Sequence, residues 1–126
     1  MAKPSSIPQI IDSITAPWSP HLAATVNDHD VKLAKIDGAF IWHAHPNSDE
    51  LFYLISGKLT MEMEGPDGTV VAQEMVVGDV LTVPKGLRHK PVADNAVILM
   101  IEKQGTVNTG DQVDSERTKE VKDARV

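Results

Sequence analysis

Two stretches of the chain carry most of the information about its fold: residues 38–57, GAFIWHAHPNSDELFYLISG, and residues 78–89, GDVLTVPKGLRH. In the first stretch, His43 and His45 are two residues apart within a run of bulky residues typical of a strand. Side chains two residues apart on a strand point to the same face of the sheet. The two imidazoles are therefore expected to project together, where they can chelate one metal ion.

Two further residues can complete this set of ligands. Glu50 follows the turn-forming residues 46–49, Pro-Asn-Ser-Asp, where a reversal of the chain can return its carboxylate to the histidines. His89 follows residues 83–86, Val-Pro-Lys-Gly, so a later strand can supply a fourth ligand. Three neutral imidazoles and one carboxylate suit one divalent transition metal: iron, manganese, nickel, cobalt, copper or zinc. An octahedral ion would keep two positions open for substrate, water or dioxygen.

The region between Leu22 and Ile101 has the composition of strands and turns. Short runs of β-branched and aromatic residues are separated there by Gly, Asn, Asp and Pro. We interpret as strands the segments 21–26, 31–36, 39–45, 50–56, 58–64, 70–76, 80–83, 89–92 and 96–102. Hairpin connections are expected at Ser56-Gly57 and at residues 65–68. The sequence therefore predicts an all-β antiparallel fold and disfavours a βαβ nucleotide fold.

The two stretches together resemble the motifs of the cupin superfamily. The first cupin motif combines a glycine, His-x-His, a glutamate and a further glycine, and the matching residues are Gly38, His43, His45, Glu50 and Gly57. The second motif combines glycine, proline, glycine and histidine, and the matching residues are Gly78, Pro84, Gly86 and His89. Gly38 lies one residue nearer His43 than is usual, and Ala93 stands where the motif has asparagine.

This resemblance implies a small single-domain cupin with a double-stranded β-helix, or jelly-roll, barrel. It also implies that His43, His45, Glu50 and His89 are the metal ligands. The barrel is expected over residues 21–104. Residues 1–20 form an arm or a short helix, because isoleucines share one helical face there while prolines bracket the segment. Residues 105–126 are expected to form a polar, extended or mobile tail without site residues, and a helix over 115–124 is the alternative.

Alternation along the expected strands predicts which side chains accompany the metal. The possible pocket-lining residues are Ile41, Phe52, Met61 and Met63, whereas Leu54 and Leu59 are interpreted as barrel filler. No acid–base residue is expected inside this pocket, because Glu62, Glu64 and Tyr53 lie on the wrong face.

The opposite face of the same strands carries bulky residues that need cover. These residues are Phe40, Trp42, Leu51, Tyr53 and Ile55. A second sheet or a second subunit could cover them, so we predict a homodimer. Arg88 and Lys90 are interpreted as surface charges, and His21 and His29 as exposed or interface residues outside the metal site.

Composition excludes several classes of function. The chain has 126 residues, no cysteine and a formal net charge of −6. The lack of cysteine excludes disulfides, thiol nucleophiles and thiolate metal sites. The negative charge opposes binding to a nucleic-acid backbone. No apolar run reaches the roughly 20 residues of a membrane span, and no secretory signal is evident, so a cytoplasmic location is expected.

The sequence therefore favours a small metalloenzyme that binds a small oxygen-bearing organic substrate through its metal. A dioxygenase is the first hypothesis, because the nitrogen and oxygen ligand set resembles that of cupin dioxygenases. The alternatives are a sugar isomerase, an epimerase or a lyase of the phosphomannose isomerase type, and a non-catalytic binding or sensory module. A closed structural zinc site would suit a scaffold role.

Overall fold

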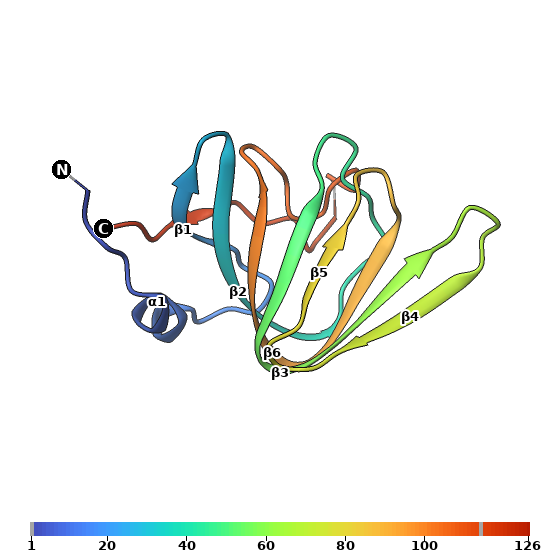
Figure 1. The fold of residues 1–126 in the computed structure, drawn as a ribbon, viewed down its shortest axis with the longest axis horizontal. Coiled ribbons are helices and arrows are strands. Elements are labelled where there is room, and N and C mark those ends of the chain that lie inside the picture. The colour runs from blue at the N-terminus through green and yellow to red at the C-terminus, as the bar shows by residue number, and fades with distance from the viewer. Residues whose placement is uncertain (1, 114) are drawn as a thin grey trace.

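The computed structural model describes residues 2–113 and 115–126. It contains one helix, α1 (Ile7–Ser13), followed by the strands β1 (His21–Val26), β2 (His29–Ala39), β3 (Glu50–Glu64), β4 (Val70–Met75), β5 (Val80–Val83), β6 (His89–Lys103) and β7 (Lys122–Asp123). Hydrogen bonds join the strands in the order β4-β3-β6-β2-β1-β7, and β5 pairs with β3. The predicted all-β fold with a short N-terminal helix is confirmed, and Figure 1 shows the long strands bending as the sheet folds over.

The centre of the sheet is the long antiparallel pair β3 and β6, although the strand pattern of the sequence predicts two shorter strands in place of each. Their register runs from Glu50 opposite Glu102 to Met63 opposite His89, with irregularities between Leu54 and Lys58. The hairpin predicted at Ser56-Gly57 is wrong. Gly57 has a φ of +80° and lies in a bulged region where the strand bends and continues.

Gly57 is required there for reasons of space as well as backbone conformation. A Cβ atom on Gly57 would lie 2.3 Å from the carbonyl oxygen of Asn95 and 2.6 Å from the Cα atom of Ala96. Only glycine lets β3 and β6 approach so closely at the bend. The motif glycine thus allows one strand to serve both halves of the folded sheet.

The strand predicted over residues 39–45 is also wrong. Strand β2 ends at Ala39, and residues 40–49, all of which are described, contain only an isolated bridge between His43 and His89. Two backbone hydrogen bonds make that bridge: His43 N to His89 O at 3.0 Å and His89 N to His43 O at 2.8 Å. The two halves of the expected metal site are therefore joined by their backbones as well.

One large core lies inside the folded sheet. Its buried residues are Trp18, Ala34, Ile36, Phe40, Phe52, Leu54, Leu59, Met61, Met75, Val83, Ala93, Ala96, Ile98 and Met100. Phe40 belongs to this core, so its predicted placement on the opposite face is wrong. The chain leaves the strand after Ala39, and strand alternation no longer governs the direction of the next side chain.

The short helix α1 covers a second, smaller core. Ser6 caps the helix by accepting a hydrogen bond from Gln9 N at 3.3 Å. Ile10 and Ile14 are buried with Ala23 and Leu33 of β1 and β2. None of the helices in the described part of the chain has the length and apolar character needed to cross a membrane.

The C-terminal segment differs from both sequence-based expectations, because it neither extends freely nor forms a helix over its described residues. It follows the barrel through a series of turns and ends with β7, which pairs in parallel with β1. Thr109 is fully buried, and its hydroxyl lies 2.6 Å from that of Thr118. Tertiary contacts with the barrel, which the amphipathic pattern could not reveal, order this segment.

Candidate metal centre

The four predicted ligands lie together inside the barrel. One ligand atom from each of His43, His45, Glu50 and His89 can be chosen so that all four lie within 4.8 Å of one another. Their exposed fractions are 2%, 4%, 4% and 0%. Such burial of four polar side chains is costly unless they bind one another or a metal ion.

Three separate segments position these side chains. His43 and His45 come from the loop after β2, whereas Glu50 and His89 are the first residues of β3 and β6. The loop is fixed by the C-terminal segment, because Ala44 N donates to the Asp111 carboxylate at 3.0 Å and Asp111 N donates to Ala44 O at 3.0 Å. A backbone this well fixed can hold both imidazoles without a metal.

Hydrogen bonds to the backbone select the ring nitrogen that faces the centre. The Nδ1 atoms of His43 and His89 lie 2.8 and 3.0 Å from the carbonyl oxygens of Ile41 and Leu87. A carbonyl oxygen only accepts, so in the neutral ring Nδ1 carries the proton and Nε2 has the lone pair. Partners of this kind orient metal-binding histidines.

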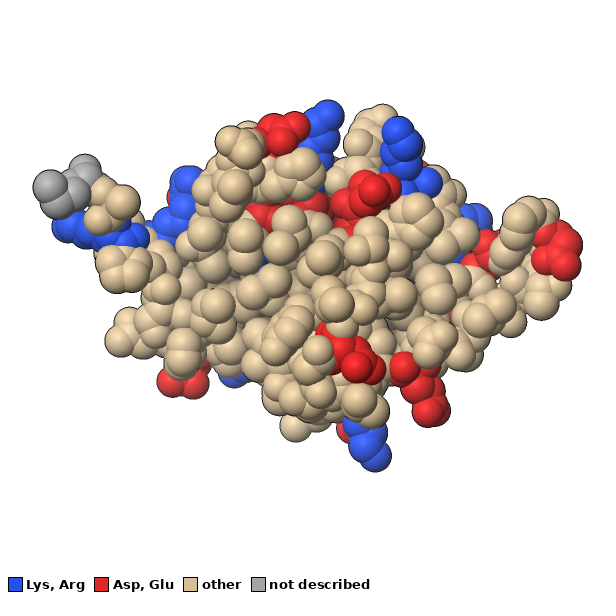
Figure 2. Space-filling model, viewed as in Figure 1, with Lys and Arg blue, Asp and Glu red and all other residues tan. Residues whose placement is uncertain are grey.

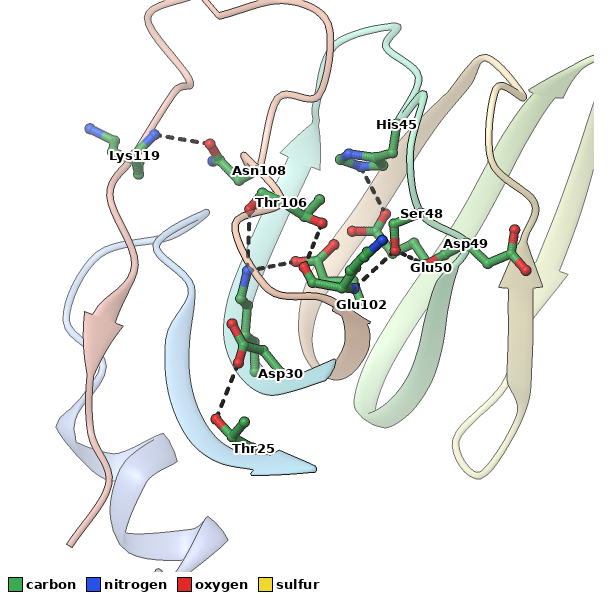
Figure 3. Close-up of polar contacts among 12 residues, drawn as sticks. Thr25, Asp30, His45, Ser48, Asp49, Glu50, Glu102, Thr106, Asn108 and Lys119 are labelled. Carbon is green, nitrogen blue, oxygen red and sulfur yellow. Dashed lines mark hydrogen bonds and ion pairs between the residues drawn. The ribbon is translucent and has the colours of Figure 1, made fainter. Parts of the chain in front are cut away.

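Several buried nitrogen atoms have no hydrogen-bond partner. His45 Nε2 lies 3.2 Å from Glu50 Oε1 (Figure 3). His89 Nε2 lies 3.4 Å from the same oxygen. Neither contact has the geometry of a hydrogen bond, and both atoms, together with His45 Nδ1, lack a partner among residues 2–113 and 115–126. Unsatisfied buried nitrogens directed at one carboxylate are what a metal site without its ion would contain. The residues present therefore fit a metal.

Electrostatics favour the protonation states that a metal requires. Burial, followed by repulsion from His89, lowers the pKa of His43 to about 4, so this imidazole is neutral at pH 7. For Glu50, burial alone would raise the pKa, but polar contacts with Glu102, His45 and His89 outweigh it and bring the pKa well below its usual value. Neutral imidazole and ionised carboxylate are the ligand forms that bind metals.

A small cavity of about 40 Å³ adjoins two of the four residues, His43 and Glu50. His43 and Glu50 line it on one side, and the rest of its wall is largely apolar and includes the aromatic rings of Trp18, Phe40 and Phe52. The Trp18 and Phe40 rings stack with their centroids 4.5 Å apart. A ligand beside the metal site would therefore meet mostly apolar surface.

The residues predicted to line the pocket have different positions. Phe52 lines the cavity together with His43 and Glu50. Met61 is fully buried in the core, and Met63 packs against that core from a partly buried position. Ile41 also packs against the core, while its other side borders a surface hollow with Trp42. The structure thus brings only Phe52 from this group to the cavity beside the histidines.

Glu102 is the residue at the site that sequence reasoning missed. It is buried at the end of β6 and lines the same cavity as Glu50. Burial, followed by repulsion from Glu50, raises the pKa of Glu102 well above its usual value, although Lys32 opposes this shift. The strand pattern held a signal, because Glu102 continues the alternate buried positions of Ile98 and Met100.

Three residues that the sequence places on the surface, His21, Arg88 and Lys90, make defined contacts in the structure. His21 is buried, with Nδ1 2.9 Å from Ser19 O, so its predicted exposure is wrong. Arg88 and Lys90 form ion pairs with Glu64 and Glu62, and both cations also lie over the Trp42 ring. These contacts lie on the outside of the sheet and leave the two cations away from the cavity.

The C-terminal segment also reaches the site, contrary to the expectation that it carries no site residue. Asn108 lines the cavity, and its amide donates to Arg117 O at 2.8 Å. The Arg117 guanidinium lies over the Trp18 ring, 5.6 Å from its centroid. Residues from both ends of the chain therefore cover the cavity.

Comparison with known proteins identifies the family. The family model described as a cupin domain matches residues 29–102. The uncharacterized protein YdbB of Bacillus subtilis is 32% identical over 90 residues, which are 71% of this chain and 76% of YdbB. A cupin-2 domain containing protein from Shewanella frigidimarina has a TM-score of 0.67 and 30% identity, covering 78% of this chain and 91% of the other.

A more distant likeness concerns the fold alone. The structure of hydroquinone 1,2-dioxygenase PnpCD in complex with Fe3+ has a TM-score of 0.68 at 18% identity, covering 80% of this chain and 32% of the other. The matched family model, the Bacillus relative and the folded sheet agree with the resemblance seen in the two sequence motifs. The chain belongs to the cupin family.

Proposed function

We propose that His43, His45, Glu50 and His89 hold one divalent transition-metal ion, and that the chain is an enzyme acting on a small oxygen-bearing organic substrate. The observation that carries the proposal is the convergence of four buried ligand atoms within 4.8 Å. Once bound, the metal would supply a Lewis acid that polarises a substrate oxygen, or a centre that activates dioxygen.

The side chains around the metal would create a dry, shaped site. Trp18, Phe40 and Phe52 exclude water from one side of the ligands. The backbone carbonyl oxygens of Ile41 and Leu87 keep the His43 and His89 rings in place. Because the cavity is only about 40 Å³, either the organic substrate is very small or the aromatic side chains move to admit it.

Among the possible reactions, we favour dioxygenase chemistry. In this reaction both atoms of dioxygen enter the organic product as a carbon–carbon bond breaks, and the substrate itself supplies the electrons. The nitrogen and oxygen ligand set and the apolar cavity wall support it. The fold is similar to that of a hydroquinone dioxygenase, so a fold of this kind is compatible with dioxygenase chemistry.

Glu102 favours a second candidate, an isomerase, epimerase or lyase. Such reactions need an acid–base group beside the metal, and a buried carboxyl lines the cavity at this position. A binding or sensory module would have the same cavity and would retain its ligand without forming a product.

Metal analysis and oxygen consumption test these proposals. Protein purified without added metal is analysed for its elements, reconstituted with iron(II), and assayed with an oxygen electrode against small diketones and phenols. Oxygen uptake that needs both iron and one substrate would support the dioxygenase. Stoichiometric zinc or nickel with no uptake would favour the second candidate, and a chain that binds no transition metal would refute the metal site. The His45→Ala variant is the matched control, because it removes a ligand from the loop.

We further propose that the protein forms a homodimer, through a surface other than the one expected from Trp42. Trp42 is already contacted by Arg88 and Lys90. In contrast, β4, β5 and the turn between them expose the side chains of Val70, Val71, Val76, Val77 and Val80. Figure 1 shows the β3–β4 hairpin projecting from the body, and β4 is an edge strand that a second copy could cover.

A further inference from the structure

A buried lysine and a buried glutamate lie beside the four candidate ligands without belonging to them. The exposed fractions of Lys32 and Glu102 are 1% and 2%, and Lys32 Nζ donates to Glu102 Oε1 at 2.9 Å. Lys32 Nζ also donates to Thr106 O at 3.3 Å. Lysine is rarely buried to this extent, so the pair needs an explanation.

The three strands at the centre of the sheet place these charges on neighbouring positions, with Glu50 directly opposite Glu102 and Lys32 two residues along β2 from the partner of Glu102, Asp30. Lys32 lies on β2, Glu102 on β6 and Glu50 on β3, and these strands are neighbours in that order. Glu50 and Glu102 are direct partners in the β3–β6 register and line the same cavity. The second oxygen of Glu102, Oε2, is buried and has no hydrogen-bond partner among the described residues. Figure 3 shows Glu102 and Glu50 extending from neighbouring strands, with His45 beyond Glu50.

Stability alone is a poor explanation for this arrangement. Replacing a buried ion pair by apolar residues of similar volume is often neutral or stabilising, because the charges lose their solvation when they are buried. The neighbouring core positions of the same two strands, such as Ala34, Ile36 and Ile98, are indeed apolar. A buried ion pair whose glutamate lies directly opposite a candidate ligand therefore points to a role at the metal site.

We infer that Lys32 and Glu102 are positioning residues, which orient the carboxylate of Glu50 for the metal. The inference rests on the proposed metal site. Lys32 fixes one oxygen of Glu102 and is itself fixed by Thr106 O, so the Glu102 carboxyl has little freedom to turn. In this arrangement the second Glu102 oxygen, Oε2, which has no hydrogen-bond partner among the described residues, would hold one side of Glu50. Glu50 Oε1, which lies near His45 and His89, would then face the metal. Metal ligands supported in this way commonly depend on the supporting residue for affinity.

The test compares variants that keep or remove the contact with Glu50, using Mn(II) as the probe. Dissociation constants are measured by calorimetry, and the spin-resonance spectrum of bound Mn(II) reports the ligand geometry. In the double variant Lys32→Met/Glu102→Leu, we expect a folded protein whose affinity for Mn(II) is weaker by about 10- to 100-fold and whose spectrum is altered. If that variant does not fold, Lys32→Gln/Glu102→Met replaces it, because the introduced glutamine amide can still donate to Thr106 O.

Two controls separate positioning from a general effect of charge. Glu102→Gln should keep the affinity within about threefold of the parent, because an amide can accept from Lys32 and donate to Glu50. The Lys90→Met/Glu62→Leu variant removes a partly exposed ion pair between β6 and β3, the strands that carry Glu102 and Glu50. This variant should leave Mn(II) binding unchanged.

The outcomes distinguish this inference from the proposed metal site. If the parent binds Mn(II) and the folded double variant binds it equally tightly, the positioning role is refuted while the metal site stands. A Glu102→Gln variant as weak as the double variant would also refute it, because the retained hydrogen bonds would then be irrelevant. If the parent binds no metal at all, the proposed metal site and this inference fail together.

Discussion

The strand β3 begins in the most buried part of the molecule and ends in an exposed hairpin. Glu50, Phe52 and Leu54 at its start are buried around the candidate metal centre, whereas the paired strand β4 at its far end exposes Val70 and Val71 by 51% and 54%. At the start of β3, the charged side chain of Glu50 is buried beside other ionisable groups. At its far end, the hairpin extends beyond the core and exposes apolar side chains. Figure 2 shows charged side chains mainly at the periphery of one face, around an uncharged centre.

This contrast indicates that the two ends of β3 serve different purposes. At the metal centre, each buried polar group restricts its neighbour, so a single substitution affects several residues. In the hairpin, side chains contact mainly solvent, so substitutions affect stability little. The following experiments test this difference, from the largest expected effect to the smallest.

The largest effect is expected at the ligands themselves. In His89→Ala, we expect the affinity for a divalent transition metal to fall by more than about 100-fold, exceeding the effect of losing a supporting residue. The barrel should stay folded, because the backbone bridge between His43 and His89 does not use the side chain. Elemental analysis and circular dichroism measure the two properties. Parent-like metal content in the variant would refute the ligand assignment.

The second-largest effect is expected at one of two glycines that have almost the same φ angle, Gly57 and Gly68. Gly57→Ala should lower the free energy of unfolding by about 3 kcal/mol or more, because the new Cβ would strike the backbone of β6. Gly68 in the exposed hairpin has a φ of +81°, and a Cβ atom added there would meet no other atom within 4 Å, so Gly68→Ala should cost only about 1 kcal/mol. Urea unfolding measures both, and equal losses would contradict the close approach at the bend.

The third effect is the pH dependence of stability in the metal-free protein. The pKa of His43 is lowered from 6.5 to about 4 in the folded state, so the unfolded state binds more protons between these values. The contribution of neutral His43 to the free energy of unfolding is complete above pH 6.5 and falls as the pH decreases toward 4. Between pH 7 and pH 5 the free energy of unfolding should therefore decrease by about 2 kcal/mol from this residue.

The measurement needs a background in which Glu102 does not titrate. The raised pKa of Glu102 acts in the opposite direction, since its stabilising contribution is present below its unfolded pKa and is lost as the pH rises through the folded pKa. Urea unfolding of Glu102→Gln at pH 7 and pH 5 isolates His43, and His43→Asn in that background should remove the dependence. Stability that increases toward pH 5 in Glu102→Gln would contradict the neutral His43.

The smallest effect on stability is expected at the exposed valines. The double variant Val71→Lys/Val77→Lys should change the free energy of unfolding of the monomer by no more than about 0.5 kcal/mol. It should nevertheless weaken the proposed dimer, because charges replace apolar side chains at the interface. Size-exclusion chromatography with light scattering measures the mass of both proteins. A parent that is monomeric at high concentration would refute the dimer.

The sequence allowed the four candidate ligands to be identified because the information is local. His43 and His45 lie two residues apart, and turn-forming residues precede both Glu50 and His89. The strand assigned to residues 39–45 was wrong, yet the histidines still converge. The reason is that the bridge to His89 imposes a strand-like geometry on His43 without a continuous strand. The position of Phe40, which lies before that bridge, followed no such rule and was mispredicted.

The cover of the cavity could not be predicted from local pattern. Trp18 and Asn108 come from opposite ends of the chain. Trp18 lies beyond the isoleucines that share a helical face, and residues 105–126 have almost no apolar stripe to indicate where they pack. Their placement depends on contacts such as those between Gly110 and Ala44, whose backbones lie too close for a Cβ atom at residue 110. Such proximity is a property of the folded chain.

The sequence by itself indicated the all-β class through its periodicity, and its two motifs resemble those of the cupin family and mark the candidate metal ligands, because periodicity and spacing are properties of neighbouring residues. The tertiary structure alone decided that Lys32 and Glu102 meet beside the candidate ligand Glu50. Lys32 and Glu102 are 70 positions apart in the chain. Their contact depends on the pairing of β2 with β6, and the position of Glu102 opposite Glu50 depends on the pairing of β6 with β3. Strand pairing is set by the burial of the whole core, so no local pattern specifies it.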